Sequence, residues 1–187
     1  MKIRETEIPG LVVIEPRVYE DARGYFYESY NERLFSEHGL PSGWVQDNES
    51  RSAMNVIRGL HYQLAPYAQA KLLRVLEGAI LDVAVDLRKN SPTFGKWSGI
   101  EISSDNRLQL LVPKGCAHGF RVLTKSATVL YKCDDFYNPS AERGILFSDS
   151  HIAIDWGIEP SRAVVSDKDM NAPSFAAADY NFIFGNI

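Results

Sequence analysis

His61 and Lys71 are the side chains whose types and spacing first suggest chemistry in this sequence. An imidazole titrates close to neutral pH, so it can accept a proton there. An ammonium group nearby would stabilise the negative charge that proton removal creates. A histidine in a strand is more often structural than catalytic, so the combination of His61 with Lys71 is what points to a carbanion-forming site.

The positions of both residues can be predicted from residue alternation. His61 lies in an alternating run from Val56 to Gln63, which predicts a β-strand. Alternation places one set of residues on a partly polar face, namely Ile57, Gly59, His61 and Gln63, and the other set on the opposite face, namely Val56, Arg58, Leu60 and Tyr62. Lys71 begins the next strand-like run, after a short loop that contains Pro66. We therefore expect the imidazole and the ammonium group at neighbouring positions on two paired strands.

A carboxylate hydrogen-bonded to the second ring nitrogen would fix the tautomer of His61 and support the imidazolium that forms. Asp167 and Asp169 are both available in the segment 166–169. The local pattern does not choose between them. Gln46 and Asn48 share a face of another extended run, over residues 44–50, and repeat the polar pattern seen at His61.

A metal centre is the main competing interpretation, because His61, Gln63 and His118 could be ligands inside a barrel. Glutamine is a poor ligand for transition metals, the sequence has no His-x-His pair, and the ammonium of Lys71 would repel a divalent cation. We therefore expect a site without metal.

Phosphate binding would depend on side chains, because neither a Walker loop nor a Rossmann fingerprint occurs. Arg23 and Arg58 have the planar fork that suits phosphate. The net charge of -4 argues against a general nucleic-acid binder.

The chain of 187 residues is expected to form one domain over residues 1–187, because nothing resembling a linker divides it. Residues 1–5 lack the apolar run of a signal peptide, and no stretch approaches the roughly 18 to 20 apolar residues of a membrane helix. We expect a cytoplasmic protein without membrane contact. Cys116 and Cys133 are too few for a disulfide framework and are predicted to be reduced, buried thiols.

Short strands at regular spacing with little helix predict an all-β sandwich or barrel. One short surface helix is predicted over residues 31–37, with Asn31 as its cap and Gly39 after its end. Residues 155–169 are expected to form an ordered loop. The expected strands cover residues 11–14, 25–30, 44–50, 56–63, 71–76, 79–85, 96–102, 108–112 and 128–133, and another strand that begins at His118.

With these residues in view, the sequence resembles the dTDP-4-dehydrorhamnose 3,5-epimerase family of sugar-nucleotide enzymes. The resemblance extends from about Ile8 to about Asp169, and the tail over residues 170–187 matches no shared motif. The matching motifs are Asp21-x-Arg23-Gly24, Gln46-Asp47-Asn48, the run from Arg58 to Gln63, Lys71, Asp86-x-Arg88-x-x-Ser91-Pro92-Thr93-Phe94-Gly95, Pro113-x-Gly115-x-Ala117-His118-Gly119-Phe120, Tyr131-Lys132 and Ser166-x-Lys168-Asp169.

The resemblance implies a cupin-type jelly roll with a few short helices, and it implies a role for each matching residue. His61 would be the base, Asp169 its partner, Tyr131 the acid on the opposite face of the sugar, and Lys71 the group that stabilises the enolate. The arginines would lie near the diphosphate. The residues that would line the substrate site are Arg23, Glu28, Gln46, Asn48, Arg58, His118, Glu142 and Lys168.

The implied activity is inversion at C3 and C5 of dTDP-4-keto-6-deoxy-D-glucose, which gives dTDP-4-keto-L-rhamnose. The family requires neither metal nor organic cofactor, and it forms homodimers in which an N-terminal strand contributes to the neighbouring subunit. Two alternatives remain open at this point. One is an epimerase that inverts a single centre or acts on a related 4-keto-6-deoxy sugar, and the other is a catalytically silent cupin that serves as a binding module.

Overall fold

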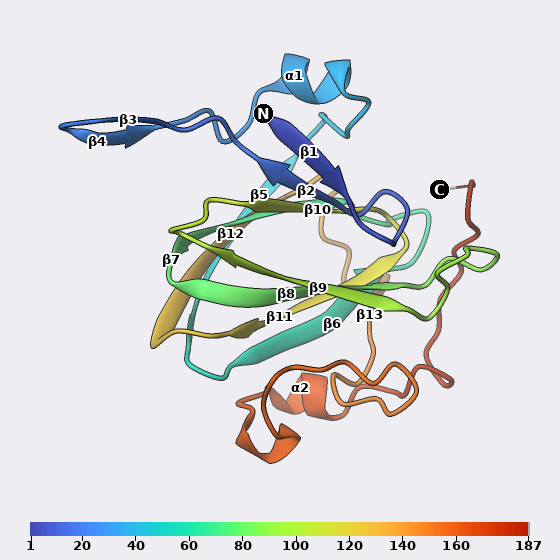
Figure 1. The fold of residues 1–187 in the computed structure, drawn as a ribbon. Helices are drawn as coiled ribbons and strands as arrows, with labels where there is room; N and C mark the ends of the chain where they lie inside the picture. Colours follow the sequence, from blue (N-terminus) through green and yellow to red (C-terminus); the bar gives the residue numbers. More distant parts are fainter. Residues whose placement is uncertain (187) are drawn as a thin grey trace.

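Two antiparallel β-sheets pack face to face in the computed structural model, which describes residues 1–186 (Figure 1). The larger sheet contains, in spatial order, β1 (Lys2–Glu5), β2 (Val12–Glu15), β10 (Gln109–Val112), β7 (Lys71–Glu77), β12 (Ser126–Cys133) and β5 (Gln46–Ala53). The smaller sheet contains β13 (Glu142–Gly144), β6 (Ile57–Gln63), β11 (Cys116–Val122), β8 (Ala79–Asp86) and β9 (Trp97–Ser103). Most neighbouring strands are distant in sequence, because the chain crosses between the sheets as in a jelly roll. The predicted all-β architecture is confirmed.

Most strands form close to their predicted bounds, because alternation and bounding turns are strong over six or more residues. The short strands β1, β3 and β13 were not predicted, since their mostly polar sequences contain no apolar run or alternation to be recognised. The strand predicted over residues 25–30 is wrong beyond Phe26. There the chain leaves a small hairpin, and the Tyr30 ring packs edge-on against Phe35 with 5.0 Å between ring centroids.

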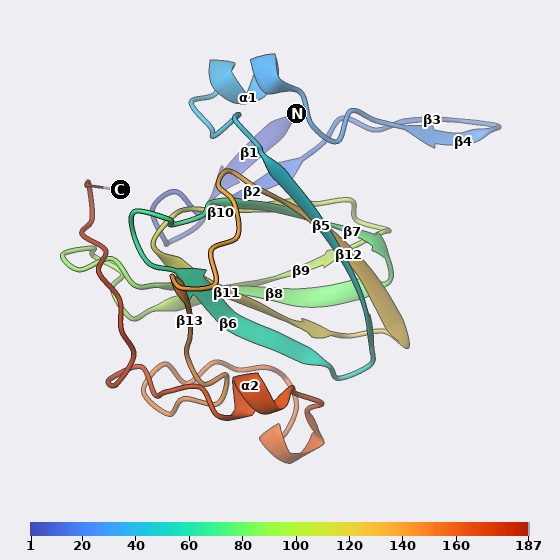
Figure 2. The same cartoon turned by 180° about the vertical axis from the view of Figure 1, so that it is seen from behind.

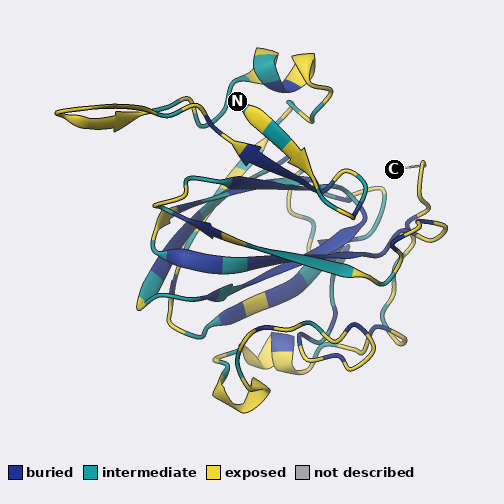
Figure 3. Cartoon of the chain, viewed as in Figure 1, coloured by how far each residue is buried: buried dark blue, intermediate teal, exposed yellow. Residues whose placement is uncertain are grey.

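That hairpin is a separate two-stranded sheet of β3 (Tyr19–Asp21) and β4 (Gly24–Phe26). It projects from the body of the sandwich, and nearly all of its surface is exposed (Figures 1 and 3). Its aromatic residues are unusually accessible, with 58% of Tyr25 and 69% of Phe26 exposed. Exposed aromatic side chains on a protruding element are a frequent feature of protein interfaces.

The predicted surface helix is α1 (Glu32–Glu37). The Asn31 side chain accepts a hydrogen bond from the Leu34 N–H at 3.2 Å, which satisfies one of the free donors of the first turn. Phe35 is the one buried residue of α1, and it packs with Ile14, Leu72 and other apolar residues on the outer face of the larger sheet.

The main core fills the space between the sheets. Val13, Leu73 and Val129 from the larger sheet pack there against Ile80 and Phe120 from the smaller one. Cys116 and Cys133 are both free and buried, as predicted. Apolar packing therefore accounts for the inner faces of both sheets, except at one end of the sandwich, where polar residues replace aliphatic ones.

The chain that follows β13, over residues 145–186, covers the outer face of the smaller sheet (Figure 2). Residues 155–169, predicted as an ordered loop, also contain the 3-10 helix η1 (Pro160–Arg162) and lead into the short helix α2 (Asp167–Met170). Phe175 and Phe182 of the tail are buried against the sheet with Val83 and Val85. The tail thus closes a second apolar layer beneath the strand that carries His61. Among residues 1–186, no helix has the length and apolar character needed to cross a membrane.

Candidate active site

Two adjoining pockets open between the sheets, with volumes of about 220 and 500 Å³. Both are lined by the same three residues, His61, Lys71 and Tyr131, which makes them parts of one cavity. His61 comes from β6 of the smaller sheet, whereas Lys71 and Tyr131 come from β7 and β12 of the larger sheet. The candidate base therefore faces the other two groups from the opposite wall of the cavity.

A buried carboxylate orients His61. His61 Nε2 lies 2.7 Å from Asp169 Oδ1, and the second oxygen of Asp169 accepts the Gly59 N–H at 3.2 Å. Burial alone would raise the pKa of Asp169, but the hydrogen bonds from His61 and Gly59 outweigh it, so the pKa lies below its ordinary value. Asp169 is only 6% exposed, whereas Asp167 points to solvent. Of the two candidate carboxylates, Asp169 is thus the one that bonds the imidazole.

The predicted face of Arg58 is wrong, because β6 contains a bulge. His61 pairs with His118 and Arg58 pairs with Phe120, so three steps along β6 match two steps along β11. The extra residue reverses the alternation, so that Ile57, Leu60 and Tyr62 join the outer apolar layer. Arg58 therefore borders the cavity together with His61.

Gly59 allows this bulge. Its φ of +117° lies in a region that favours glycine, and a Cβ built there would meet Gly119 Cα and the His118 carbonyl oxygen at 2.6 Å. The two strands approach so closely that only a hydrogen fits.

The predicted pairing of the strands that carry His61 and Lys71 is also wrong. β6 pairs with β11 and β13, whereas β7 pairs with β10 and β12. The loop over residues 64–70 crosses from one sheet to the other, so Lys71 belongs to the opposite wall. On that wall the ring centroid of Tyr131 lies 5.9 Å from Lys71 Nζ.

Burial shifts the titration of both groups on that wall. It lowers the pKa of Lys71, although electrostatic interactions with Cys133, Asp82 and Glu142 oppose the shift. It raises the pKa of Tyr131, so the hydroxyl stays protonated across the neutral range and is available as an acid. The cavity thus holds a base with its carboxylate partner, a cation and a protonated hydroxyl.

Polar side chains surround the smaller pocket. Gln46 and Asn48 project from β5 on one face, as predicted, and the Gln46 amide donates to Asn48 Oδ1 at 3.0 Å. Glu142 Oε2 lies 2.6 Å from Lys168 Nζ and accepts a hydrogen bond from the Tyr137 hydroxyl at 2.8 Å. Tyr137 was not predicted, since an isolated tyrosine in a loop carries no sequence signal.

Arg58 and Lys168 border the larger pocket together with Lys71, and Lys168 is paired there with Glu142. Arg58 Nε donates to Ser52 Oγ at 2.9 Å, which orients the guanidinium at the edge of the cavity. The contact of Arg58 with Ser52 on β5 was not predicted, because the sequence does not predict the bulge that brings Arg58 to this face.

A second histidine–aspartate pair lies beside the first. His118 is the cross-strand neighbour of His61 and borders the larger pocket. Its Nε2 lies 2.5 Å from Oδ1 of Asp82, which is fully buried on β8. Asp82 was not singled out from the sequence, although an acidic residue in the middle of the apolar run over residues 79–85 is a signal that could have identified it.

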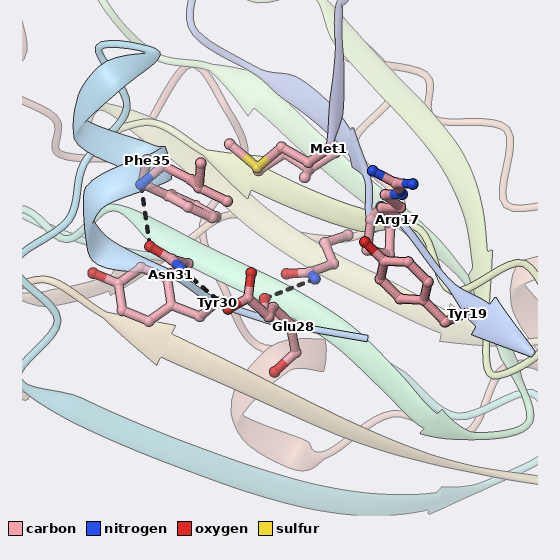
Figure 4. A pocket seen from close by; sticks show the side chains of 12 residues that line it. Met1, Arg17, Tyr19, Glu28, Tyr30, Asn31 and Phe35 are labelled. Atoms are coloured by element: carbon pink, nitrogen blue, oxygen red, sulfur yellow. Dashed lines mark hydrogen bonds between the residues drawn. The ribbon is translucent and has the colours of Figure 1, made fainter. Parts of the chain in front are cut away.

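Two predicted substrate residues do not border this cavity. Arg23 is at the turn of the projecting hairpin, with 90% of its side chain exposed, and pairs with Asp21 at 2.6 Å. Glu28 lines a separate pocket on the outer side of the larger sheet, with Tyr30 and Phe35 (Figure 4). There it accepts a hydrogen bond from the Asn31 amide at 3.2 Å.

Gln63 fits the metal interpretation poorly. Its amide nitrogen donates to the Tyr67 carbonyl at 2.7 Å, and its oxygen accepts the Asn138 N–H at 2.7 Å. Both polar atoms of the Gln63 side chain are thus used in hydrogen bonds to two loops. Within residues 1–186, no group of three or more His, Cys, Asp and Glu residues is arranged to hold a metal ion.

The jelly roll and the polar cavity between its sheets define a cupin-type protein with a set of acid, base and cation suited to proton transfer next to a carbonyl group. Residues 5–177 match the family model described as dTDP-4-dehydrorhamnose 3,5-epimerase. The chain belongs to this family.

Individual relatives agree with this assignment. A dTDP-4-dehydrorhamnose 3,5-epimerase of Shigella flexneri is 50% identical over 96% of this chain and 99% of its own length. The crystal structure of such an epimerase from Elizabethkingia anophelis has a TM-score of 0.91 at 52% identity, covering 94% of this chain and 97% of that one. A 3,5-epimerase from Legionella pneumophila, solved in complex with dTDP-4-keto-L-rhamnose, has a TM-score of 0.90 at 45% identity, covering 95% and 94%. The family predicted from the sequence motifs is therefore confirmed.

Proposed function

We propose that this protein inverts C3 and C5 of dTDP-4-keto-6-deoxy-D-glucose and so forms dTDP-4-keto-L-rhamnose. The observation that carries the proposal is the position of His61 and Tyr131 on opposite walls of one cavity, with Lys71 beside Tyr131. Inversion requires a base on one face of the sugar and an acid on the other. A single-centre epimerase is less well supported, since the similar proteins described above are 3,5-epimerases.

The chemistry follows from the 4-keto group of the substrate, which acidifies the protons on both adjacent carbons. His61 removes one of these protons, while Asp169 holds the ring and stabilises the imidazolium. The negative charge moves to the ketone oxygen, where the ammonium of Lys71 stabilises it in a partly dry site. Tyr131 then delivers a proton from the opposite wall. The same steps at the second carbon complete the double inversion.

The nucleotide end of the substrate needs groups that recognise phosphate and a base. Arg58 and Lys168 are the cationic residues of the larger pocket besides Lys71, and they suit the diphosphate. Gln46, Asn48 and Glu142 supply donors and acceptors around the smaller pocket, and His118 borders the sugar side beside His61. No residue in this arrangement calls for a metal or an organic cofactor.

Incorporation of solvent deuterium tests the double inversion. With the unmodified protein in D₂O, we expect NMR to show label at both C3 and C5 of an inverted product, because each inversion exchanges one proton with a group that equilibrates with solvent. If label and inversion occur at one carbon only, the protein is a single-centre epimerase and the proposed double inversion is wrong. Absence of label at both carbons, in a protein that binds dTDP, would indicate a silent cupin.

We also propose that the protein forms a homodimer in which the β3–β4 hairpin reaches the cavity of the second subunit. The exposed Tyr25 and Phe26 of the hairpin support this, because they would be covered by such a contact. The position of Arg23 supports it as well. This residue is outside the cavity of its own chain, although the family resemblance assigns it to the substrate site.

Mixing two inactive variants tests this sharing of residues. Arg23→Ala and His61→Ala are each expected to be impaired alone. When the two are co-expressed, a mixed dimer has one cavity with an intact His61 and an intact Arg23 from the other subunit. Activity should then exceed the sum of the separate variants, and a simple sum would mean that Arg23 does not act in the partner's cavity. Co-expression of His61→Ala with Asp169→Asn is the matched control, because both changes disable the cavity of the chain that carries them.

A further inference from the structure

Asp82 is a buried carboxylate in an apolar position. It lies in the middle of β8 and is 0% exposed, and its neighbours on the same face of the strand, Ile80 and Ala84, belong to the core between the sheets. An ionised carboxylate in such surroundings is destabilising unless it is paired and hydrogen-bonded. Its partners should therefore explain why the position is acidic.

The first partner is His118. Its Nε2 lies 2.5 Å from Asp82 Oδ1, and the imidazole is itself only 7% exposed. His118 stands directly across from His61 on the adjacent strand. Asp82 therefore orients the ring next to the candidate base in the same way that Asp169 orients His61. A carboxylate bonded to one ring nitrogen fixes the direction of the other.

Lys71 is the second group on which the charge of Asp82 acts. Asp82 Oδ2 is buried and has no hydrogen-bond partner within the described part of the chain, so half of this carboxylate remains available for a longer-range interaction. Burial lowers the pKa of Lys71, and the negative charge of Asp82 is one of the influences that oppose this shift. An ammonium that must meet a developing enolate has to stay protonated, so a fixed anion that acts on it is useful.

Other groups around Lys71 come from both walls of the cavity. Cys133 and Tyr131 come from β12, Glu142 from β13, His61 from β6 and His118 from β11. Glu142 already bonds Lys168 and Tyr137 at the edge of the cavity, and Cys133 is a neutral thiol whose pKa burial raises. Among the groups named here, all within residues 1–186, Asp82 is the fully buried carboxylate, and its Oδ2 has no hydrogen-bond partner.

We propose that Asp82 is a positioning residue for the epimerisation: it orients His118 beside His61 and provides the fixed negative charge that keeps the Lys71 ammonium in place for the enolate. This inference rests on the function proposed above. It assigns Asp82 no contact with the substrate. A purely structural role would mean only that Asp82 and His118 tie β8 to β11.

Asp82→Asn is the variant that separates these roles, because the side-chain amide keeps its shape and can still accept a hydrogen bond from His118 while the charge is lost. We expect kcat to fall by about 10- to 100-fold, because the charge-assisted hydrogen bond to His118 becomes a weaker neutral one and the anion is lost. We also expect the alkaline limb of the kcat profile to move to lower pH, because Lys71 loses an anion that raises its pKa and therefore deprotonates earlier. Binding of dTDP, measured by calorimetry, should be unchanged.

Asp149→Asn is the matched control. Asp149 is another buried carboxylate, 7% exposed, and it accepts backbone N–H groups of Ile152 and Phe175 outside the cavity. Its replacement can lower stability but should leave the kcat of folded protein and its pH profile unchanged. A folded Asp82→Asn protein with the kcat and the alkaline limb of the unmodified enzyme would overturn the proposal.

If Asp82→Asn does not fold, His118→Gln provides the test. It keeps the charge of Asp82, so we expect a lower kcat with the alkaline limb in its original place, and unchanged kcat would contradict the positioning role. The deuterium experiment on the unmodified protein stands apart from these variants. Its failure would remove the proposed function, whereas failure of the variants would remove only the role of Asp82.

Discussion

His61→Ala is expected to give a folded protein that still binds dTDP but has lost epimerisation and deuterium exchange together. His61 is the group of the smaller sheet that lines both pockets and is bonded to a buried carboxylate, so one base starts both inversions. Loss of a general base typically lowers the rate by about 10²- to 10⁴-fold. Removal of the imidazole leaves the buried carboxylate of Asp169 with mainly the Gly59 N–H as its partner, so we expect a folded protein of lower thermal stability.

The measurement is NMR of substrate incubated in D₂O, with dTDP binding followed by calorimetry. His38→Ala is the matched control, since His38 is an exposed residue at the end of α1. It should keep normal exchange and inversion. Wash-in of deuterium at a near-normal rate in folded His61→Ala would remove His61 from the mechanism.

Tyr131→Phe is expected to separate exchange from inversion. The change removes only the hydroxyl, so His61 can still abstract a proton and the enolate can still form beside Lys71. Without an acid on the opposite wall, reprotonation should come mainly from the face that lost the proton. Inversion should fall by about 10²- to 10⁴-fold, while labelled substrate of unchanged configuration accumulates.

NMR in D₂O that follows configuration and label in one time course tests this outcome. Tyr67→Phe is a suitable control, because Tyr67 is 45% exposed and does not border either pocket of the cavity. If Tyr131 only packs its ring against the substrate, the phenylalanine variant should invert as fast as the unmodified protein. That result would end the proposed role of Tyr131 as the acid.

The polar residues of the cavity could be recognised from the sequence because each interrupts a local pattern. His61 and Gln63 replace apolar residues on the inner face of a strand, and Gln46 and Asn48 do the same on β5. Strand alternation has a period of two residues and is readable over six or seven positions. The order of motifs from Ile8 to Asp169 then indicated the family, which the family model confirms.

Two sequence-based errors at the site share one cause. Strand alternation assigned Arg58 to the wrong face, although the family resemblance implied a place at the substrate site, because a single bulged residue at the close approach of Gly59 and Gly119 reverses the alternation. Lys71 was assigned to a strand paired with that of His61, whereas the crossover loop carries it to the other sheet. Both features depend on contacts between segments distant in sequence, which a local pattern does not contain.

The residue types needed for proton transfer, the all-β architecture and the family are thus encoded in short stretches of sequence, because alternation, turns and motifs are local. Strand partners, the bulge and the burial of Asp82 beneath His118 arise only when distant strands pack together. The local pattern left Asp169 and Asp167 open, the family resemblance implied Asp169, and the packed structure has its contact with His61. The position of Arg23 outside the cavity of its own chain is likewise decided by the tertiary structure. The physical reason is that a side chain's neighbours across a sandwich are set by sheet pairing and packing, whereas its chemical type is set by the sequence alone.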